Sequence, residues 1–189
     1  MSLSDGAPAT SAYRVAADGW IPEARRLESP NFDARPADCK IELLVIHCIS
    51  LPPGCFGSGD IERLFTNQLD CTAHEFYAQL RGVRVSAHFL ISRNGCLTQF
   101  VSCRDRAWHA GVSSWDGRAG CNDFSVGIEL EGSEFEPFTA EQYASLDLLQ
   151  HALILAYPLR WTRGHSEIAP GRKSDPGPLF DWTRVPREH

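Results

Sequence analysis

IELLVIH, residues 41–47, is a continuous apolar block rich in branched side chains. Because its apolar residues do not alternate with polar ones, we expect a strand that is buried on both faces. His47 ends this block, directly before the loop SLPPGCFGSG, residues 50–59. The block therefore predicts a strand in a sheet covered by helices, with a histidine at the carboxyl end of the strand.

Further strands are predicted downstream. The segments 83–92 and 96–102 flank Asn94-Gly95, a dipeptide typical of a tight hairpin turn. SVGIELEG, residues 125–132, is another expected strand. Together with the apolar block, these segments predict a sheet that contains a hairpin.

Two helices are predicted around these strands. Asp60 is the expected N-cap of a short helix with an apolar stripe formed by Ile61, Leu64, Phe65 and Leu69. Thr139 and Gln142 form a capping-box pattern before a longer helix, whose apolar face runs through Tyr143, Leu146, Leu149, Leu153 and Tyr157. From Arg160 onward, the Pro- and Gly-rich sequence predicts loop. Strands mixed with helices predict an α/β fold, a mixed β-sheet flanked by helices.

Length and charge narrow the class of protein. The chain has 189 residues, 43% of them hydrophobic and 22% charged, which suits one globular domain. We expect a flexible tail over residues 1–17, which are small and polar, and a single domain over 18–185. The 18 Lys and Arg against 24 Asp and Glu give a net charge of −6, which argues against nucleic acid or an anionic membrane as partner.

The sequence predicts a cytoplasmic protein. Residues 1–20 lack a basic segment followed by an apolar one, which speaks against a secretory signal. The longest uncharged stretch, residues 43–59, is interrupted by Pro52 and Pro53, so no transmembrane helix is expected. The seven cysteines include no CxxC pair, which disfavours zinc fingers and thioredoxin-like motifs, and we expect them to be reduced and mostly buried.

Two segments carry residues suited to metal chemistry. His47 ends an otherwise apolar strand, the position where sites in α/β sheets gather. GHSEIAPGRKSDPGP, residues 164–178, places His165, Lys173 and Asp175 on a loop stiffened by prolines. His47, His165 and Asp175 would complete a three-ligand zinc site. The alternative, equally compatible with the spacing, is a surface loop with a Lys–Asp pair.

A carboxylate within an apolar strand is the third candidate. Glu129 in VGIELEG is costly to bury unless it is paired or functional, and it could take the proton of a metal-bound water. Glu131 lies on the same face, because side chains alternate along a strand, so periodicity does not choose between the two carboxylates. A structural or solvated role is expected for four other histidines: His74, His88, His151 and His189.

Four segments in order along the chain combine into a recognisable pattern: VIHCISLPPGCFG (45–57), RVSAHFLI (84–91), RAWHAGVSSWDGRAGCNDFSVGIELEG (106–132) and GHSEIAPGRKSDPGPLFDW (164–182). Together they resemble the AmpD-type 1,6-anhydro-N-acetylmuramoyl-L-alanine amidases, zinc enzymes of cytoplasmic peptidoglycan recycling. These belong to the superfamily of type-2 amidases and peptidoglycan recognition proteins. The similarity extends from about Gly19 to Trp182, nearly the whole chain.

This resemblance implies an amidase-2 fold and a specific reaction. The amide bond between the lactyl group of anhydromuramic acid and L-alanine of the stem peptide would be cleaved, and the protein would act on anhydromuropeptides as a monomer. The implied zinc ligands are His47, His165 and Asp175. The implied catalytic residues are Glu129, as general base, and Lys173, as partner of the oxyanion. Three residues lie in segments that face substrate in the family: Arg84, Trp108 and Arg172.

The chain departs from the family pattern at two places. Cys48 follows the first zinc histidine where the family often has Asn, and residues 165–167 are His-Ser-Glu instead of His-Cys-Asp. The first change suggests an alternative mechanism, in which the Cys48 thiolate attacks the substrate or binds metal. Two other functions stay open: a non-catalytic module that binds peptidoglycan fragments, and an amidase that acts on intact cell wall. An anionic peptide substrate on a protein of net charge −6 further predicts a locally basic pocket.

Overall fold

The computed structural model describes residues 12–189 of the chain. Residues 1–11, which make up most of the predicted tail, lie outside the described part. The apolar block forms β3 (Leu43–Ile49), which lies between β9 (Ser125–Glu131) and the edge strand β10 (Trp161–Gly164). The first five residues of β3 are fully or almost fully buried. The prediction of a strand buried on both faces is therefore confirmed.

β3 belongs to a mixed sheet of six strands, which lie in the order β1-β5-β4-β9-β3-β10. The other strands are β1 (Arg25–Arg26), β4 (Phe89–Ile91), β5 (Leu97–Gln99), β9 (Ser125–Glu131) and β10 (Trp161–Gly164). β4, β9, β3 and β10 are parallel to one another, whereas β5 is antiparallel to β4. The carboxyl ends of the parallel strands thus meet at one edge, where ligand sites of α/β sheets lie.

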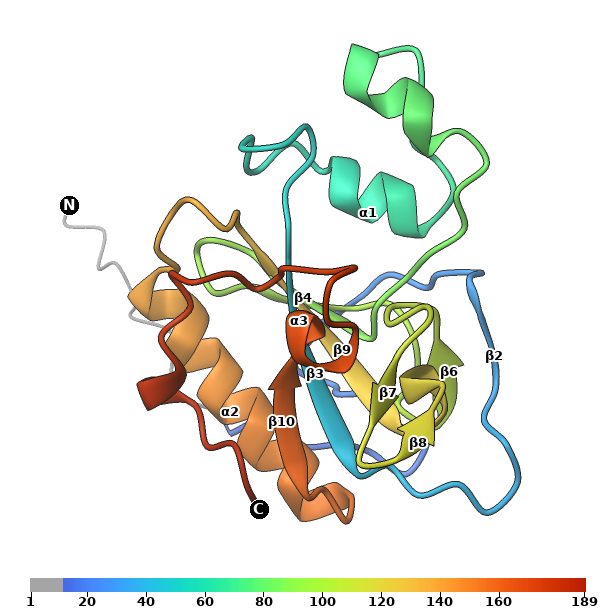
Figure 1. Cartoon of the computed structure of the whole chain (residues 1–189), viewed down its shortest axis with the longest axis vertical. Helices are drawn as coiled ribbons and strands as arrows, with labels where there is room; N and C mark the ends of the chain where they lie inside the picture. The colour runs from blue at the N-terminus through green and yellow to red at the C-terminus, as the bar shows by residue number, and fades with distance from the viewer. Residues whose placement is uncertain (1–11) are drawn as a thin grey trace, which may run out of the picture.

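Apart from α2, the remaining elements are short. Two small antiparallel sheets pair β2 (Phe32–Ala34) with β6 (Asp105–Ala107) and β7 (Ser114–Trp115) with β8 (Arg118–Ala119). The α-helices are α1 (Asp60–Phe65), α2 (Ala140–Ala156) and α3 (His165–Ile168), and the 3₁₀ helices are η1 (Glu75–Leu80), η2 (Cys121–Asp123) and η3 (Trp182–Arg184). Figure 1 shows α2 along one face of the sheet and α1 beyond one of its ends.

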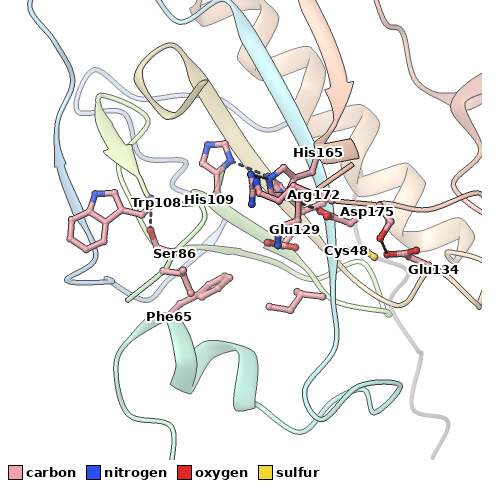
Figure 2. A pocket seen from close by; sticks show the side chains of 15 residues that line it. Cys48, Phe65, Ser86, Trp108, His109, Glu129, Glu134, His165, Arg172 and Asp175 are labelled. Carbon is pink, nitrogen blue, oxygen red and sulfur yellow. Dashed lines mark hydrogen bonds and ion pairs between the residues drawn. The ribbon is translucent and has the colours of Figure 1, made fainter. Parts of the chain in front are cut away.

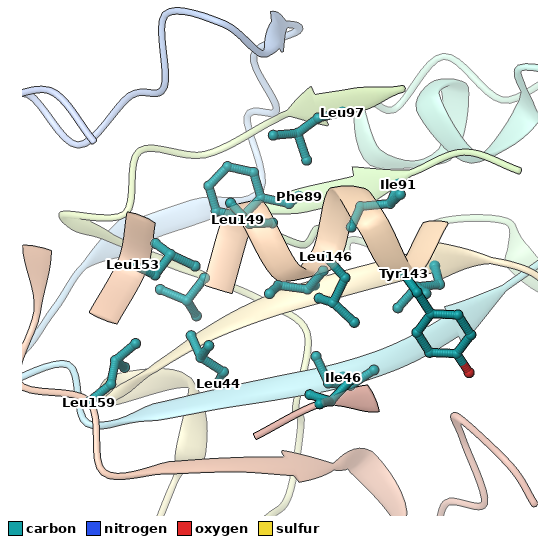
Figure 3. Close-up of a cluster of buried hydrophobic side chains, with 14 of the residues drawn as sticks. Leu44, Ile46, Phe89, Ile91, Leu97, Tyr143, Leu146, Leu149, Leu153 and Leu159 are labelled. Carbon is teal, nitrogen blue, oxygen red and sulfur yellow. The ribbon is translucent and has the colours of Figure 1, made fainter. Parts of the chain in front are cut away.

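The core lies on both faces of the sheet. On one face, α2 packs its leucines against side chains of β3, β4 and β9, among them Leu44, Ile46, Phe89 and Ile91 (Figure 3). On the other face, Leu43 and Val45 pack against Ala110, Phe124 and Ile168. Full burial of one such aliphatic side chain stabilises the fold by about 1.5–3 kcal/mol. Since side chains alternate along β3, His47 falls on the same face as Leu43 and Val45.

The two predicted helices form, one of them with a different cap. Thr139 and Gln142 make the predicted capping box at the start of α2. The prediction that Asp60 caps α1 is wrong, because Gly59 is the N-cap and Asp60 is the first helical residue. Gly59 has φ 76°, a conformation that glycine adopts without strain, and the Asp60 carboxylate bonds to Arg63 and Tyr77 instead. The predicted apolar stripe of α1 is buried at Ile61, Leu64 and Phe65.

The hairpin is confirmed, but the prediction of loop beyond Arg160 is wrong in part. β4 and β5 pair around Gly95, and both strands are shorter than expected. Residues Trp161–Gly164 form β10, and α3 follows directly. β10 is only four residues long and is stabilised by its pairing with β3, so a local pattern dominated by the surrounding Pro and Gly does not indicate it.

All seven cysteines are free, as predicted. The expectation that most of them are buried is wrong, since only Cys103 and Cys121 are buried. Cys55 and Cys96 are exposed because they lie in loops outside the strands. Within residues 12–189, no helix has the length and apolar character required to cross a membrane.

Candidate active site

Three potential metal ligands meet near the carboxyl end of β3. His47 belongs to β3, His165 is the first residue of α3 directly after β10, and Asp175 lies on the loop that follows. Oδ2 of Asp175 lies 3.0 Å from Nδ1 of His47 and 3.2 Å from Nδ1 of His165. One ligand atom from each residue lies within 4.8 Å of the others. The fold thus brings together the three residues that the sequence singled out as a metal set.

The strand pairing explains why these residues meet. β10 runs parallel to β3 and pairs Gly164 with Ile46, so that the next residues, His165 and His47, are neighbours. The loop carrying Asp175 returns to the same place because the Asp175 carbonyl accepts a hydrogen bond from the backbone N–H of Ser166 at 2.9 Å. Segments more than a hundred residues apart in the sequence therefore supply one site.

The geometry of the set fits a tetrahedral metal site. Two ligands bound at zinc distances to a tetrahedral ion lie about 3.3 Å apart, close to the 3.0 and 3.2 Å separations of the two histidines from Asp175. The other ring nitrogen of His165, Nε2, lies 3.0 Å from the carbonyl oxygen of Ala110. That partner favours a proton on Nε2 and leaves the Nδ1 lone pair for a metal. Three protein ligands with a fourth position for water are typical of catalytic zinc sites.

Burial and hydrogen bonding favour the cation-binding forms of two of the ligands. Burial lowers the pKa of His47 below its usual 6.5, and the opposing effect of Asp175 does not cancel this shift. For Asp175, burial alone would raise the pKa, but hydrogen bonds to His165 and His47 outweigh it and hold the pKa well below its usual range. A neutral imidazole and an ionised carboxylate are the forms that bind metal.

Glu129 is a buried carboxylate beside this set. It lies on β9 directly opposite His47 in the register of β9 and β3. Its side chain is almost fully buried, and its Oε2 has no hydrogen-bond partner within the described residues. Burial, followed by the negative charge of Asp175, raises the pKa of Glu129 well above its ordinary value, and Lys173 opposes this shift. A buried carboxylate with an unpaired oxygen is suited to accept a proton.

Glu131, which periodicity could not separate from Glu129, has a different environment. Its two carboxylate oxygens accept hydrogen bonds from the backbone N–H groups of Gly57 and Arg93. Glu131 therefore anchors two loops, whereas Glu129 lines the cavity and has an oxygen without a partner.

A cavity of about 490 Å³ opens in front of the set. Glu129, Lys173, Trp108 and Arg172 line it together with the three ligands, and Figure 2 shows Glu129, His165, Arg172 and Asp175 grouped on one side. Arg84 does not line this cavity. Its exposed side chain borders a separate cavity of about 130 Å³.

Arg172 already has partners within the protein. Its Nη2 donates hydrogen bonds to the carbonyl oxygens of Ala110 at 2.6 Å and Val112 at 2.7 Å. Two cationic side chains line the cavity, Arg172 and Lys173. Three carboxylates line it as well: Glu129, Glu134 and Asp175. The prediction of a basic pocket is therefore wrong for the protein side chains, because three carboxylates accompany the two cations.

Cys48 lines the same cavity but does not suit the rival thiolate role. Burial, followed by the charge of Glu129 and then that of Asp175, raises the pKa of the Cys48 thiol well above its ordinary value. A thiol that stays protonated is a poor nucleophile and a poor metal ligand.

His109 is a residue of the site that the sequence reasoning missed. It follows Trp108 on the loop after β6, and its Nδ1 lies 2.9 Å from Nε2 of His47. Burial, followed by the proximity of His47 and His88, lowers the pKa of His109 well below its usual value. The only signal in the sequence was its place inside one segment of the family pattern, residues 106–132, since its contact with β3 depends on the fold.

Comparison with protein families and curated proteins places the chain among known amidases. Residues 37–178 match the Amidase_2 family, described as N-acetylmuramoyl-L-alanine amidase. The 1,6-anhydro-N-acetylmuramyl-L-alanine amidase AmpD of Salmonella typhimurium is 53% identical over 168 residues, which cover 88% of this chain and 90% of that protein. AmpD of Escherichia coli is 52% identical over 168 residues, 88% of this chain and 92% of that protein.

Solved structures give a corresponding result for the fold. A crystal structure of an AmpD selenomethionine derivative superposes with a TM-score of 0.85 at 52% identity, covering 88% of this chain and 94% of that one. The amidase AmiD of E. coli, solved with the substrate anhydro-N-acetylmuramic acid-L-Ala-D-γ-Glu-L-Lys, gives a TM-score of 0.56 at 30% identity. That match covers 92% of this chain and 64% of that one.

Proposed function

The chain belongs to the N-acetylmuramoyl-L-alanine amidase family, and from this premise we propose that it is a zinc-dependent hydrolase of anhydromuropeptides. The bond cleaved is the amide between 1,6-anhydro-N-acetylmuramic acid and L-alanine of the stem peptide. One observation carries the proposal: His47, His165 and Asp175 converge in a cavity that is also lined by Glu129, a buried carboxylate with an unpartnered oxygen.

In this proposal His47, His165 and Asp175 hold the zinc ion. Bound there, the ion would lower the pKa of a water molecule from about 15.7 to about 7 and polarise the scissile carbonyl group. The low pKa of Asp175 and the neutral state of His47 keep both side chains ready to bind it near neutral pH.

Glu129 has the properties of the group that moves the proton. Its unpartnered Oε2 would accept a proton from the attacking water and return it to the nitrogen of the leaving alanine. Its raised pKa improves it as a base, because a carboxylate of ordinary pKa holds a proton too weakly at neutral pH. The ammonium group of Lys173, which lines the same cavity, would stabilise the negative charge that develops on the carbonyl oxygen.

Three further residues are proposed to bind substrate. Trp108 lines the cavity and offers an apolar face for the sugar. Arg172 uses Nε and Nη2 for backbone carbonyls, which leaves Nη1 for a carboxylate of the stem peptide. For Arg84, which lies outside the cavity, contact with the peptide stays a prediction. A cytoplasmic location and a monomeric state likewise stay predictions.

The alternative of a binding module without catalysis has less support, because the three proposed ligands, Glu129 and Lys173 all border one cavity. A comparison of cleavage of an anhydromuropeptide with cleavage of intact cell-wall sacculi distinguishes the proposed function from the alternative of an amidase that acts on intact cell wall.

Two substitutions test the assigned roles. We expect Glu129→Gln to retain zinc, measured per chain by elemental analysis, and to lower the turnover of an anhydromuropeptide by about 10²–10⁴-fold, the usual contribution of a proton-transfer group. Asp175→Ala should lower both the bound zinc and the turnover. The matched control is Glu131→Gln, the same change on the same face of β9, which should retain both. Full turnover by Glu129→Gln, or an unchanged zinc content in Asp175→Ala, would remove that residue from its role.

A further inference from the structure

A row of hydrogen-bonding groups leads away from the candidate metal site through His109. His47 presents Nδ1 to Asp175, so its other ring nitrogen points away from the metal ligands. That nitrogen, Nε2, lies 2.9 Å from Nδ1 of His109. On the far side of the His109 ring, Nε2 lies 3.1 Å from Oγ of Ser125. Both nitrogens of His109 therefore have a partner, one on β3 and one on β9.

The positions of the protons in this row follow from the nitrogen that binds the metal. A metal ion takes the lone pair of Nδ1 of His47, so the proton of the neutral ring is on Nε2. Nδ1 of His109 must then accept that proton in a hydrogen bond. The proton of His109 itself is consequently on Nε2, from which it is donated to Ser125. Metal ligation at one end thus selects one tautomer for both imidazoles.

The shape of β9 fixes the His109 ring in this place. Ser125, Gly127 and Glu129 lie on the same face of the strand, and the ring sits over Gly127. A Cβ atom on Gly127 would lie 2.4 Å from Cγ of His109, far inside van der Waals contact. The absence of a side chain at Gly127 therefore allows the imidazole to pack directly on the strand, between Ser125 and Glu129.

The backbone of His109 is anchored as well. The N–H groups of His109 and Ala110 both donate to Oδ1 of Asn122, at 3.2 and 2.8 Å. The carbonyl of Ala110 in turn lies 3.0 Å from Nε2 of His165. Two consecutive residues, His109 and Ala110, thus contact the outer nitrogens of both metal-ligating histidines. Figure 2 shows His109 and His165 beside the cavity.

We propose that His109 is a positioning residue of the metal site, which accepts the Nε2 proton of His47 and so orients Nδ1 of His47 toward the ion. This inference rests on the proposed metal site and assigns it a supporting residue. Groups that hydrogen-bond to the outer nitrogen of a ligating histidine typically contribute a factor of about 10–100 to metal affinity or activity.

Zinc affinity, measured by competition with a chromophoric chelator, tests the proposal without reference to hydrolysis. His109→Phe keeps a ring over Gly127 but removes the acceptor, and we expect it to weaken zinc binding about 10–100-fold. His109→Asn places an amide oxygen near the position of Nδ1 and should recover most of that loss. The control Gln150→Leu removes buried hydrogen bonds to Thr162 and Pro186, away from the site, and should leave zinc affinity unchanged. A folded His109→Phe with wild-type affinity would overturn the proposal.

A second measurement does not depend on any variant being folded. Nitrogen-15 NMR of the histidine rings in the zinc-loaded wild-type protein reports which nitrogen of each ring carries the proton. We expect protons on Nε2 of both His47 and His109. A proton on Nδ1 of His109 would contradict the proposal, because that nitrogen could not then accept from His47.

Asp175→Ala in the same series separates this inference from the proposed function. If Asp175→Ala binds zinc as tightly as the wild-type protein, the metal site itself is wrong and the role of His109 falls with it. If Asp175→Ala loses zinc while His109→Phe retains it, only the role of His109 is wrong.

Discussion

Glu129 and Glu131 stand two residues apart on the same face of β9, and their partners give them different roles. Backbone N–H groups of two loops satisfy Glu131. Glu129 has an oxygen without a partner and a raised pKa, which burial and the neighbouring Asp175 cause. At the scale of single residues, the unpartnered oxygen of Glu129 beside the metal-ligand candidates distinguishes it from Glu131, since a buried polar group without a partner is costly unless it acts on a ligand.

His88 illustrates the opposite case, a buried histidine whose ring is fully satisfied. Its Nδ1 accepts from the backbone N–H of Gly127, and its Nε2 lies 3.1 Å from the carbonyl oxygen of Asp105. Burial, reinforced by the charge of Arg35, lowers the pKa of His88 to about 3. Between pH 6.5 and about 3, His88 is thus neutral in the fold and becomes protonated only when the chain unfolds.

This shift predicts a pH dependence of stability. Between pH 6.5 and about 3 the unfolded chain binds one more proton at this residue than the folded one, so the free energy of unfolding falls as the pH is lowered through that window. His88→Asn keeps an acceptor for Gly127 but does not titrate. Urea unfolding of the metal-free proteins should show a slope that is shallower in the variant by up to about 1.4 kcal/mol per pH unit. Equal slopes in the two proteins would contradict the assignment.

The metal-ligating and catalytic candidates could be predicted from the sequence for a physical reason. His47 at the end of an apolar strand and Glu129 inside one are polar groups in places where burial is expensive. The polar loop 164–178 then suggested His165 and Asp175 as further metal ligands, and the resemblance to known amidases assigned a role to Lys173. His109 could not be predicted in this way, because its proposed role depends on a contact with β3 that no local sequence pattern indicates.

At the scale of elements, α2 and β10 show two kinds of sequence signal. α2 carries its own signals, a capping box and an apolar face, and both appear in the structure. β10 has only four residues and a polar composition, and it forms a strand through its pairing with β3. The element that places His165 was therefore the one least visible in the sequence.

The capping box of α2 gives a test at this scale. Oγ1 of Thr139 accepts from the backbone N–H of Gln142 and donates to the carbonyl of Arg93, which ties the helix to the sheet. We expect Thr139→Ala to lower the free energy of unfolding by about 1 kcal/mol, with no change in zinc affinity, because the site lies on the other face of the sheet. Thr139→Ser, which keeps the hydroxyl group, is the control. Urea unfolding and chelator competition measure the two quantities, and a loss of zinc affinity in Thr139→Ala would show that this end of α2 is coupled to the site.

At the scale of the whole molecule, the fold assembles one site from segments that are distant in sequence. The parallel pairing of β9, β3 and β10 aligns Glu129, His47 and His165 at one edge of the sheet. The loop after α3 adds Asp175, and the loop after β6 adds His109. The net charge of −6 could not predict the cavity, because the carboxylates that we propose to bind metal or move protons lie inside it.

The most direct test of the account is the product of one reaction followed by mass spectrometry. A defined anhydromuropeptide is incubated with the zinc-loaded protein, with the chelator-stripped protein and with the stripped protein after zinc is restored, and intact cell-wall sacculi are treated in parallel. We predict release of free 1,6-anhydro-N-acetylmuramic acid and of a peptide that begins with L-alanine, loss of this release on stripping, its recovery with zinc, and little release from sacculi. Unchanged turnover after complete removal of the metal, or no cleavage by the zinc-loaded protein, would contradict the account.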